Sequence, residues 1–104
     1  MVKEITVKKL KKELYNNNIK LIDVRESMEV KICSIKKSNH IPMNEILTAI
    51  ITLEKDKKYA IMCHSGIRSY NVALYLSEEG FDVFNVKGGI DEWARQIDKD
   101  MERY

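Results

Sequence analysis

The sequence predicts a single α/β domain built on a mostly parallel sheet that carries helices on both faces. Short apolar runs rich in β-branched residues alternate with segments in which apolar residues recur at helical spacing. Repeated strand–helix units of this length favour parallel strands, because each helix returns the chain to the start of the next strand. The length fits one domain over residues 1–104 and leaves no room for a second core.

The first third of the chain predicts two strands with a helix between them. Residues 5–7 predict a short strand, and a helix opens at Thr6 or Val7 with an apolar face of Val7, Leu10 and Leu14. The run 21–24 (Leu-Ile-Asp-Val) has the composition of a buried parallel strand. Residues 27–30 then predict one helical turn, and the polar stretch that follows predicts a loop.

The middle of the chain predicts an edge strand, a helix and a further strand. Residues 40–42 (His-Ile-Pro) predict the edge strand, since edges tolerate proline. Asn44 is predicted to cap a helix whose inner side carries Ile46, Leu47, Ile50 and Leu53. The run 59–62 (Tyr-Ala-Ile-Met) predicts the next strand, which ends immediately before Cys63.

The last third predicts a helix, a strand and a final helix. The first helix runs from about Arg68 to Glu79 and ends at Gly80, a residue suited to the position after a helix. Residues 83–86 predict a strand. The turn 87–89 (Lys-Gly-Gly) leads into the final helix, which contains Trp93 and Ile97; we interpret Trp93 as core packing.

Composition excludes several classes of protein. The net charge of +2 calls for neither nucleic acid nor a membrane surface, and no apolar run is long enough to span a bilayer. Two cysteines are too few for a disulfide framework and lack zinc-site spacing, so we expect no metal and a reducing cytoplasm. Residues 1–22 hold six lysines and two glutamates, which favours a solvated helix and leaves open an acidic protein partner.

The segment 63–69 carries the clearest chemical signal. In open α/β sheets, ligands bind where strands end and helices begin, and Cys63 stands at such a junction. Loop N–H groups and the positive helix end lower a thiol pKa, so Cys63 is predicted to be a nucleophilic thiolate. Gly66 permits a backbone turn that a β-carbon would hinder, and Arg68 adds a fixed charge for an oxyanion. The alternative is a small core cysteine, but the loop residues His64, Ser65, Gly66 and Arg68 suit an anion site better.

Five segments resemble the rhodanese-like sulfurtransferases in the same order along the chain. The loop 63–69 resembles the C-x-S-G-x-R-S active-site loop, and 21–26 resembles an L-I-D-V-R-E strand and turn. The His40-Ile41-Pro42 element, the Gly80-Phe81 strand entry and the closing 88–93 (G-G-x-x-x-W) match as well. The resemblance implies a three-layer sandwich with about five mainly parallel strands. It also implies a persulfide on Cys63, no metal or organic cofactor, a small anionic sulfur donor such as thiosulfate, and a cyanide or thiol acceptor.

Loop length separates this chemistry from a related one. Four residues lie between Cys63 and Arg68, whereas phosphatases and arsenate reductases that resemble this fold use a loop one residue longer. The shorter loop suits a single sulfur atom on the cysteine. Arg68 and His64 are expected to make the pocket cationic, which favours an anionic donor.

The other loop residues have predicted supporting roles with alternatives. We expect His64, Ser65, Gly66, Ile67, Arg68 and Ser69 to surround the bound sulfur. His64 either tunes the thiolate or has no chemical task, and Ser65 and Ser69 either donate to the thiolate or cap the following helix. Asp23 and Arg25 either brace the catalytic loop or simply pair with each other.

The segment between Val30 and Pro42 departs from the family pattern. Cys33-Ser34 and Lys37-Ser38 replace Gly-His and Gly-Ala, which puts the turn geometry in question. Cys33 is either a small filler or a resolving thiol for an oxidised Cys63. Two function classes therefore stand: a sulfurtransferase enzyme, or a sulfur-carrier or redox-signalling module that receives persulfide from a protein partner.

Overall fold

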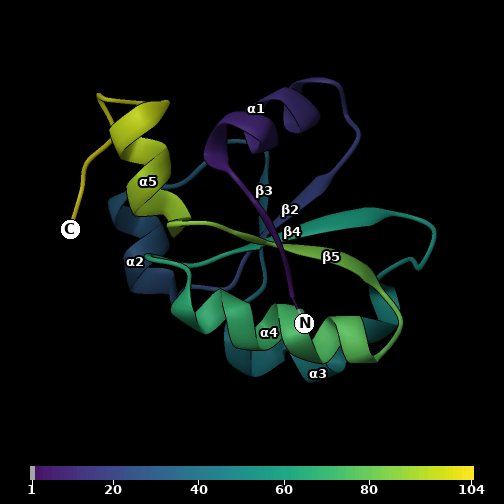
Figure 1. Cartoon of the computed structure of the whole chain (residues 1–104). Helices are drawn as coiled ribbons and strands as arrows, with labels where there is room; N and C mark the ends of the chain where they lie inside the picture. Colours follow the sequence, from purple (N-terminus) through teal and green to yellow (C-terminus); the bar gives the residue numbers. More distant parts are fainter. Residues whose placement is uncertain (1) are drawn as a thin grey trace.

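Five parallel strands form the centre of the protein in a computed structural model that describes residues 2–104 (Figure 1). The strand order is β1-β5-β4-β2-β3, and every neighbouring pair is parallel. This confirms the predicted mainly parallel sheet. The strands are β1 (Lys3–Ile5), β2 (Lys20–Asp23), β3 (Ser38–His40), β4 (Lys58–Met62) and β5 (Asp82–Val86).

Helices cover both faces of this sheet, as predicted. On one face lie α1 (Val7–Tyr15) and α5 (Gly89–Gln96), which contact each other, and on the other face lie α3 (Ile46–Ala49) and α4 (Ile67–Glu78) (Figure 1). The helix α2 (Ser27–Ile32) lies beside the start of α4 in the same view. Two 3₁₀-helices, η1 (Met43–Glu45) and η2 (Ile50–Thr52), flank α3.

Each face of the sheet has its own apolar core. One core contains Ile22, Ile61, Val72 and Leu76 and includes the side chain of Cys63. The other contains Leu10, Leu21, Met62 and Trp93, which confirms Trp93 as a packing residue. Neighbouring residues of β2 and β4 enter opposite cores, as the alternation of side chains along a strand requires. Because β4 is the middle strand, the residue that follows it is held between two packed layers.

The first strand lies two residues earlier than predicted. Thr6 is the N-cap of α1, where its Oγ1 accepts a hydrogen bond from the Lys9 N–H at 3.2 Å. β1 therefore stops before Thr6 and the helix begins at Val7, although both residues have β-branched side chains that suit a strand. The predicted apolar face of α1 is confirmed: its buried residues are Val7, Leu10 and Leu14.

The region 38–53 differs most from its prediction. The edge strand covers 38–40 rather than 40–42, and after it the N–H groups of Ile41 and Met43 donate to the carbonyls of Asp23 and Val24, each at 3.0 Å. Asn44 lies inside η1 and caps no helix, and the predicted long helix is one α-turn between two 3₁₀-turns. Its many β-branched residues disfavour a longer α-helix. Leu47, predicted to point inward, is 70% exposed.

The loop before β3 turns without the glycines expected there. The Ser38 N–H and Oγ both donate to the Ile35 carbonyl, at 3.0 and 2.6 Å. Among residues 2–104, Asn17 is the one non-glycine residue with positive φ, so this turn needs no left-handed residue. Within the same range, no helix is long and apolar enough to cross a membrane.

Candidate active site

Cys63 follows the central strand directly and is 1% exposed. The Gly66 N–H donates to its Sγ at 3.1 Å, and the Ser69 Oγ lies 3.3 Å from the same sulfur. Burial raises the pKa of the Cys63 thiol, but the Ser69 hydroxyl and the N–H groups of Ser69, Gly66 and Ser65 outweigh it, and the net shift is downward. Hydrogen bonds from this short loop thus favour the thiolate form.

The loop keeps its shape through a left-handed glycine and close backbone packing. Gly66 has φ +106°, which a residue with a β-carbon rarely adopts. The Ile90 N–H donates to the Cys63 carbonyl at 2.9 Å, and the Asp91 N–H donates to the His64 carbonyl at 3.1 Å. A β-carbon on Gly89 would lie 2.5 Å from the Cys63 carbonyl oxygen and 2.4 Å from that of His64. The start of α5 therefore holds the Cys63 loop in place.

Behind the thiol lies a buried polar network that the sequence reasoning missed. The Ser69 hydroxyl lies 2.6 Å from Asn85 Oδ1, and the Asn85 amide donates to the Gly66 carbonyl and to Glu4. A hydroxyl carries one proton, so Ser69 donates either to Asn85 or to Cys63 at a given moment. An asparagine in the otherwise apolar run 83–86 is the signal that could have indicated this network.

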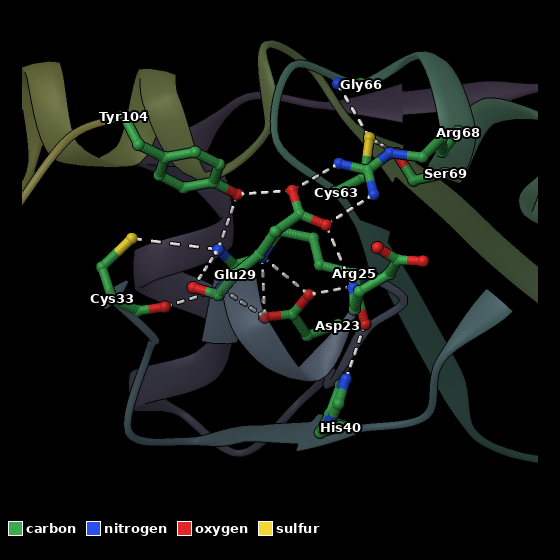
Figure 2. A network of polar contacts seen from close by, with 11 residues as sticks. Asp23, Arg25, Glu29, Cys33, His40, Cys63, Gly66, Arg68, Ser69 and Tyr104 are labelled. Carbon is green, nitrogen blue, oxygen red and sulfur yellow. Dashed lines mark hydrogen bonds and ion pairs between the residues drawn. The ribbon is translucent and has the colours of Figure 1, made fainter. Parts of the chain in front are cut away.

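Arg68 is held by a carboxylate that sequence analysis did not assign to the site. Its Nη1 and Nη2 donate to Oε1 and Oε2 of Glu29, both at 2.7 Å (Figure 2). The Arg68 guanidinium lowers the pKa of Glu29 to about 2, despite partial burial of the carboxyl. The sequence predicts Arg68 as a free cation for an oxyanion, whereas the structure joins it to Glu29 of α2 in a bidentate pair.

Asp23 and Arg25 form a fully buried ion pair. The shortest contact joins Arg25 Nη2 to Asp23 Oδ2 at 2.7 Å, and both side chains are almost completely inaccessible. Arg25 also donates to the carbonyls of Glu29 and Cys33, which ties α2 and the following loop to β2. Of the two predicted alternatives, pairing with each other is therefore observed. Their side-chain hydrogen bonds within residues 2–104 reach the segment 63–69 only through Glu29 and Tyr104.

Tyr104 contacts the site from the far end of the chain. Its ring stacks on His64 with 4.1 Å between ring centroids and an angle of 15° between the planes. Its hydroxyl donates to Glu29 Oε2 and accepts from Arg25 Nη1, each at 2.8 Å (Figure 2). His64 Nε2 is buried and has no hydrogen-bond partner in the described chain. The local pattern around residue 104 gives no signal of this contact.

The remaining predicted residues lie at the edges of the site. Ile67 begins α4 and is 73% exposed, and Ser65 faces the thiol through its N–H. Cys33 follows α2, with its Sγ 3.8 Å from Arg25 Nη1, and both cysteines are free thiols. A resolving role for Cys33 stays a prediction. The Nε2 atom of His40 lies 2.6 Å from the Arg25 carbonyl oxygen.

Comparison with models of protein families shows to which family the chain belongs. The model of the rhodanese-like domain matches residues 6–96. The chain belongs to the rhodanese-like domain family. It is 44% identical over 93 residues to the putative sulfurtransferase YtwF of Bacillus subtilis, and the match covers 88% of this chain and 90% of that one.

One solved structure and one further relative are similar over most of the chain. A rhodanese-like domain protein from Staphylococcus aureus superposes with a TM-score of 0.85 at 33% identity, over 99% of both chains. The thiosulfate sulfurtransferase GlpE of Vibrio cholerae is 30% identical over 76 residues, which is 72% of each chain. The predicted family and fold class are thereby confirmed.

This rhodanese-like site has two chemically different parts. The thiol lies in a nest of N–H donors at the start of α4, an arrangement that stabilises negative charge on sulfur. On the side that faces α2, the charge of Arg68 is paired with that of Glu29. The arrangement favours the thiolate form of Cys63, while the charge available to a diffusing anion is smaller than the loop sequence indicates.

Proposed function

We propose that this protein moves sulfane sulfur from a small anionic donor such as thiosulfate to cyanide or a thiol, through a persulfide on Cys63. The observation that carries the proposal is the lowered pKa of a thiol surrounded by loop N–H donors. Membership of a family whose relatives are named sulfurtransferases supports it. The name of the Vibrio cholerae relative supports thiosulfate as a donor.

The proposed reaction has two displacements. The Cys63 thiolate attacks the outer sulfur of thiosulfate, the sulfur–sulfur bond of the donor breaks, and sulfite leaves with the bonding electrons. Cyanide or a thiolate then attacks the outer sulfur of the persulfide, and the electrons of that bond return to Cys63. Thiocyanate or a new persulfide is the product, and no net oxidant or reductant is consumed.

The proposed roles of the other residues follow from their contacts. The N–H groups of Ser65, Gly66 and Ser69 stabilise negative charge on the sulfur. The Asp23–Arg25 pair supports α2, and α2 supplies the partner of Arg68. The exposed side chain of Ile67 lies at the first turn of α4, where it meets a donor or acceptor approaching the loop. We place this chemistry in a reducing cytoplasm, where the thiols stay free.

The decisive experiment measures thiocyanate formed from thiosulfate and cyanide. We expect turnover by the wild type and by Cys33→Ser, and none by Cys63→Ser. The two variants make the same chemical change at the two cysteines, so loss confined to Cys63→Ser assigns the reacting sulfur. Equal activity of wild type and Cys63→Ser would reject the proposal. Hydrolysis of p-nitrophenyl phosphate by the wild type would point to phosphatase chemistry instead.

A sulfur carrier is the second candidate. The lysines of α1 are exposed, and Lys11, Lys36 and Lys37 border an apolar groove between α1 and α5, an arrangement that favours an acidic protein partner. A carrier is expected to accept one sulfur atom on Cys63, visible by intact mass, without turnover on thiosulfate and cyanide. Turnover that depends on Cys63 excludes it.

A further inference from the structure

The carboxylate of Glu29 receives four hydrogen-bond donors from three separate parts of the chain. Arg68 contributes two of them, both at 2.7 Å. The Tyr104 hydroxyl donates at 2.8 Å and the Glu26 N–H at 3.1 Å (Figure 2). The Glu29 side chain is 18% exposed and that of Arg68 is 37% exposed. This many donors keep one carboxylate at one place beside the catalytic loop, ionised and aligned with the guanidinium.

The pair lies close enough to Cys63 to affect the reacting sulfur. The hydrogen bond to Glu29 is the largest influence raising the pKa of Arg68, and the negative charge of the Cys63 thiolate contributes as well. Arg68 lies in the first turn of α4, directly after the Cys63 loop, and Figure 2 shows its side chain on the Cys63 side of Glu29. Glu29 therefore competes with any anion that approaches Cys63 for the charge of Arg68.

We propose that Glu29 is a specificity-determining residue, which withholds the charge of Arg68 and so disfavours anionic sulfur donors at Cys63. The inference rests on the proposed function and names a residue that raises the KM for the anionic donor proposed there. A cavity of about 520 Å³ borders Arg68, and two further carboxylates, Glu26 and Glu45, line it. An anion entering beside α2 meets an arginine that is already neutralised, together with these negative charges.

Substitution by glutamine isolates the charge. Glu29→Gln keeps the size of the side chain and an oxygen that can accept from Tyr104 or Arg68, but it frees the positive charge of Arg68. Thiosulfate is a dianion, so its KM is expected to fall about five-fold in Glu29→Gln while kcat changes little. Glu29→Asp, which restores the negative charge, is expected to keep a KM near that of the wild type.

A second readout needs no turnover. Iodoacetate and iodoacetamide alkylate a thiolate by the same displacement and differ in one negative charge. The rates at Cys63 are followed by peptide mass spectrometry in a Cys33→Ser background. The rate with iodoacetate divided by the rate with iodoacetamide is expected to rise about five-fold in Glu29→Gln. Tyr104→Phe removes one hydrogen bond to Glu29 but no charge, and Glu45→Gln removes a charge from the cavity wall without touching Arg68. Each control is expected to change the ratio less than two-fold.

The outcomes separate this inference from the proposed function. A higher iodoacetate ratio in Glu29→Gln supports it, even if no variant turns over thiosulfate; that combination would reject only the donor. An unchanged or lower ratio overturns it, whatever the turnover shows. An equal rise in Glu45→Gln also overturns it, because the effect would then come from general charge rather than from the Arg68 pair.

Discussion

The two sides of Cys63 are built differently. On the side that faces β5 and α5, the residues Ser69, Asn85 and Gly89 are buried. There the backbone at the start of α5 packs directly against the backbone of the Cys63 loop. On the α2 side, Glu29 and Arg68 are partly exposed and meet through long side chains. The buried side leaves little space for another side chain, and it sets the shape of the loop and the pKa of the Cys63 thiol. The partly exposed side can change its charge without moving the backbone, so it is where donor preference can vary.

The largest expected effect comes from filling the buried side. Gly89→Ala places a β-carbon 2.5 Å from the Cys63 carbonyl oxygen and forces an alanine to adopt φ +62°. We expect a loss of about 3 kcal/mol in the free energy of unfolding, and a loss of sulfur transfer of roughly ten-fold or more, because the loop must shift. Urea unfolding and the thiocyanate assay measure the two effects.

Gly80→Ala is the matched control for this prediction. Gly80 has φ +93°, but its β-carbon would meet only the end of the flexible Lys55 side chain at 3.4 Å. It is expected to cost about 1 kcal/mol and to leave sulfur transfer unchanged. Equal effects of the two alanines on activity would show that the contact between Gly89 and the Cys63 loop is unimportant.

A smaller change on the same side tests the thiol. Ser69→Ala removes a hydroxyl that lowers the pKa of Cys63, so this pKa is expected to rise toward its ordinary value. The pH midpoint for alkylation by iodoacetamide then moves upward. Ser65 acts through its N–H, so Ser65→Ala is expected to leave the midpoint in place. An unmoved midpoint in Ser69→Ala means that the hydroxyl donates to Asn85 throughout.

The smallest effect concerns the partly exposed side and depends on pH. The pKa of Glu29 is about 2 in the folded protein against an ordinary value of 4.5, so the folded state binds this proton less readily than the unfolded chain. The stability from the Glu29–Arg68 pair is fully present above pH 4.5 and is lost as pH falls toward 2. The difference in unfolding free energy between wild type and Glu29→Gln should shrink over this window. If the difference in unfolding free energy does not change with pH, the Glu29–Arg68 ion pair does not stabilise the folded protein.

Local pattern predicted most of the architecture because periodicity depends on neighbouring residues. The apolar face of α1 and the strand before Cys63 were visible as repeats of apolar positions, and they occur as predicted. The segment 43–52 departs from its predicted helix. There, apolar spacing resembled a helix, but the β-branched side chains and Pro42 favoured short 3₁₀-turns.

The sequence by itself determined the family, the order of strands and helices along the chain, and the place of Cys63 between a strand and a helix. Only the tertiary structure decided what surrounds that cysteine. Glu29 and Arg68 are 39 positions apart, and Tyr104 is 75 from Glu29. Contacts at such separations depend on how the elements pack, and an arginine looks the same in a sequence whether its charge is free or paired. The loop therefore predicted a cationic pocket, and the fold placed a carboxylate against its arginine.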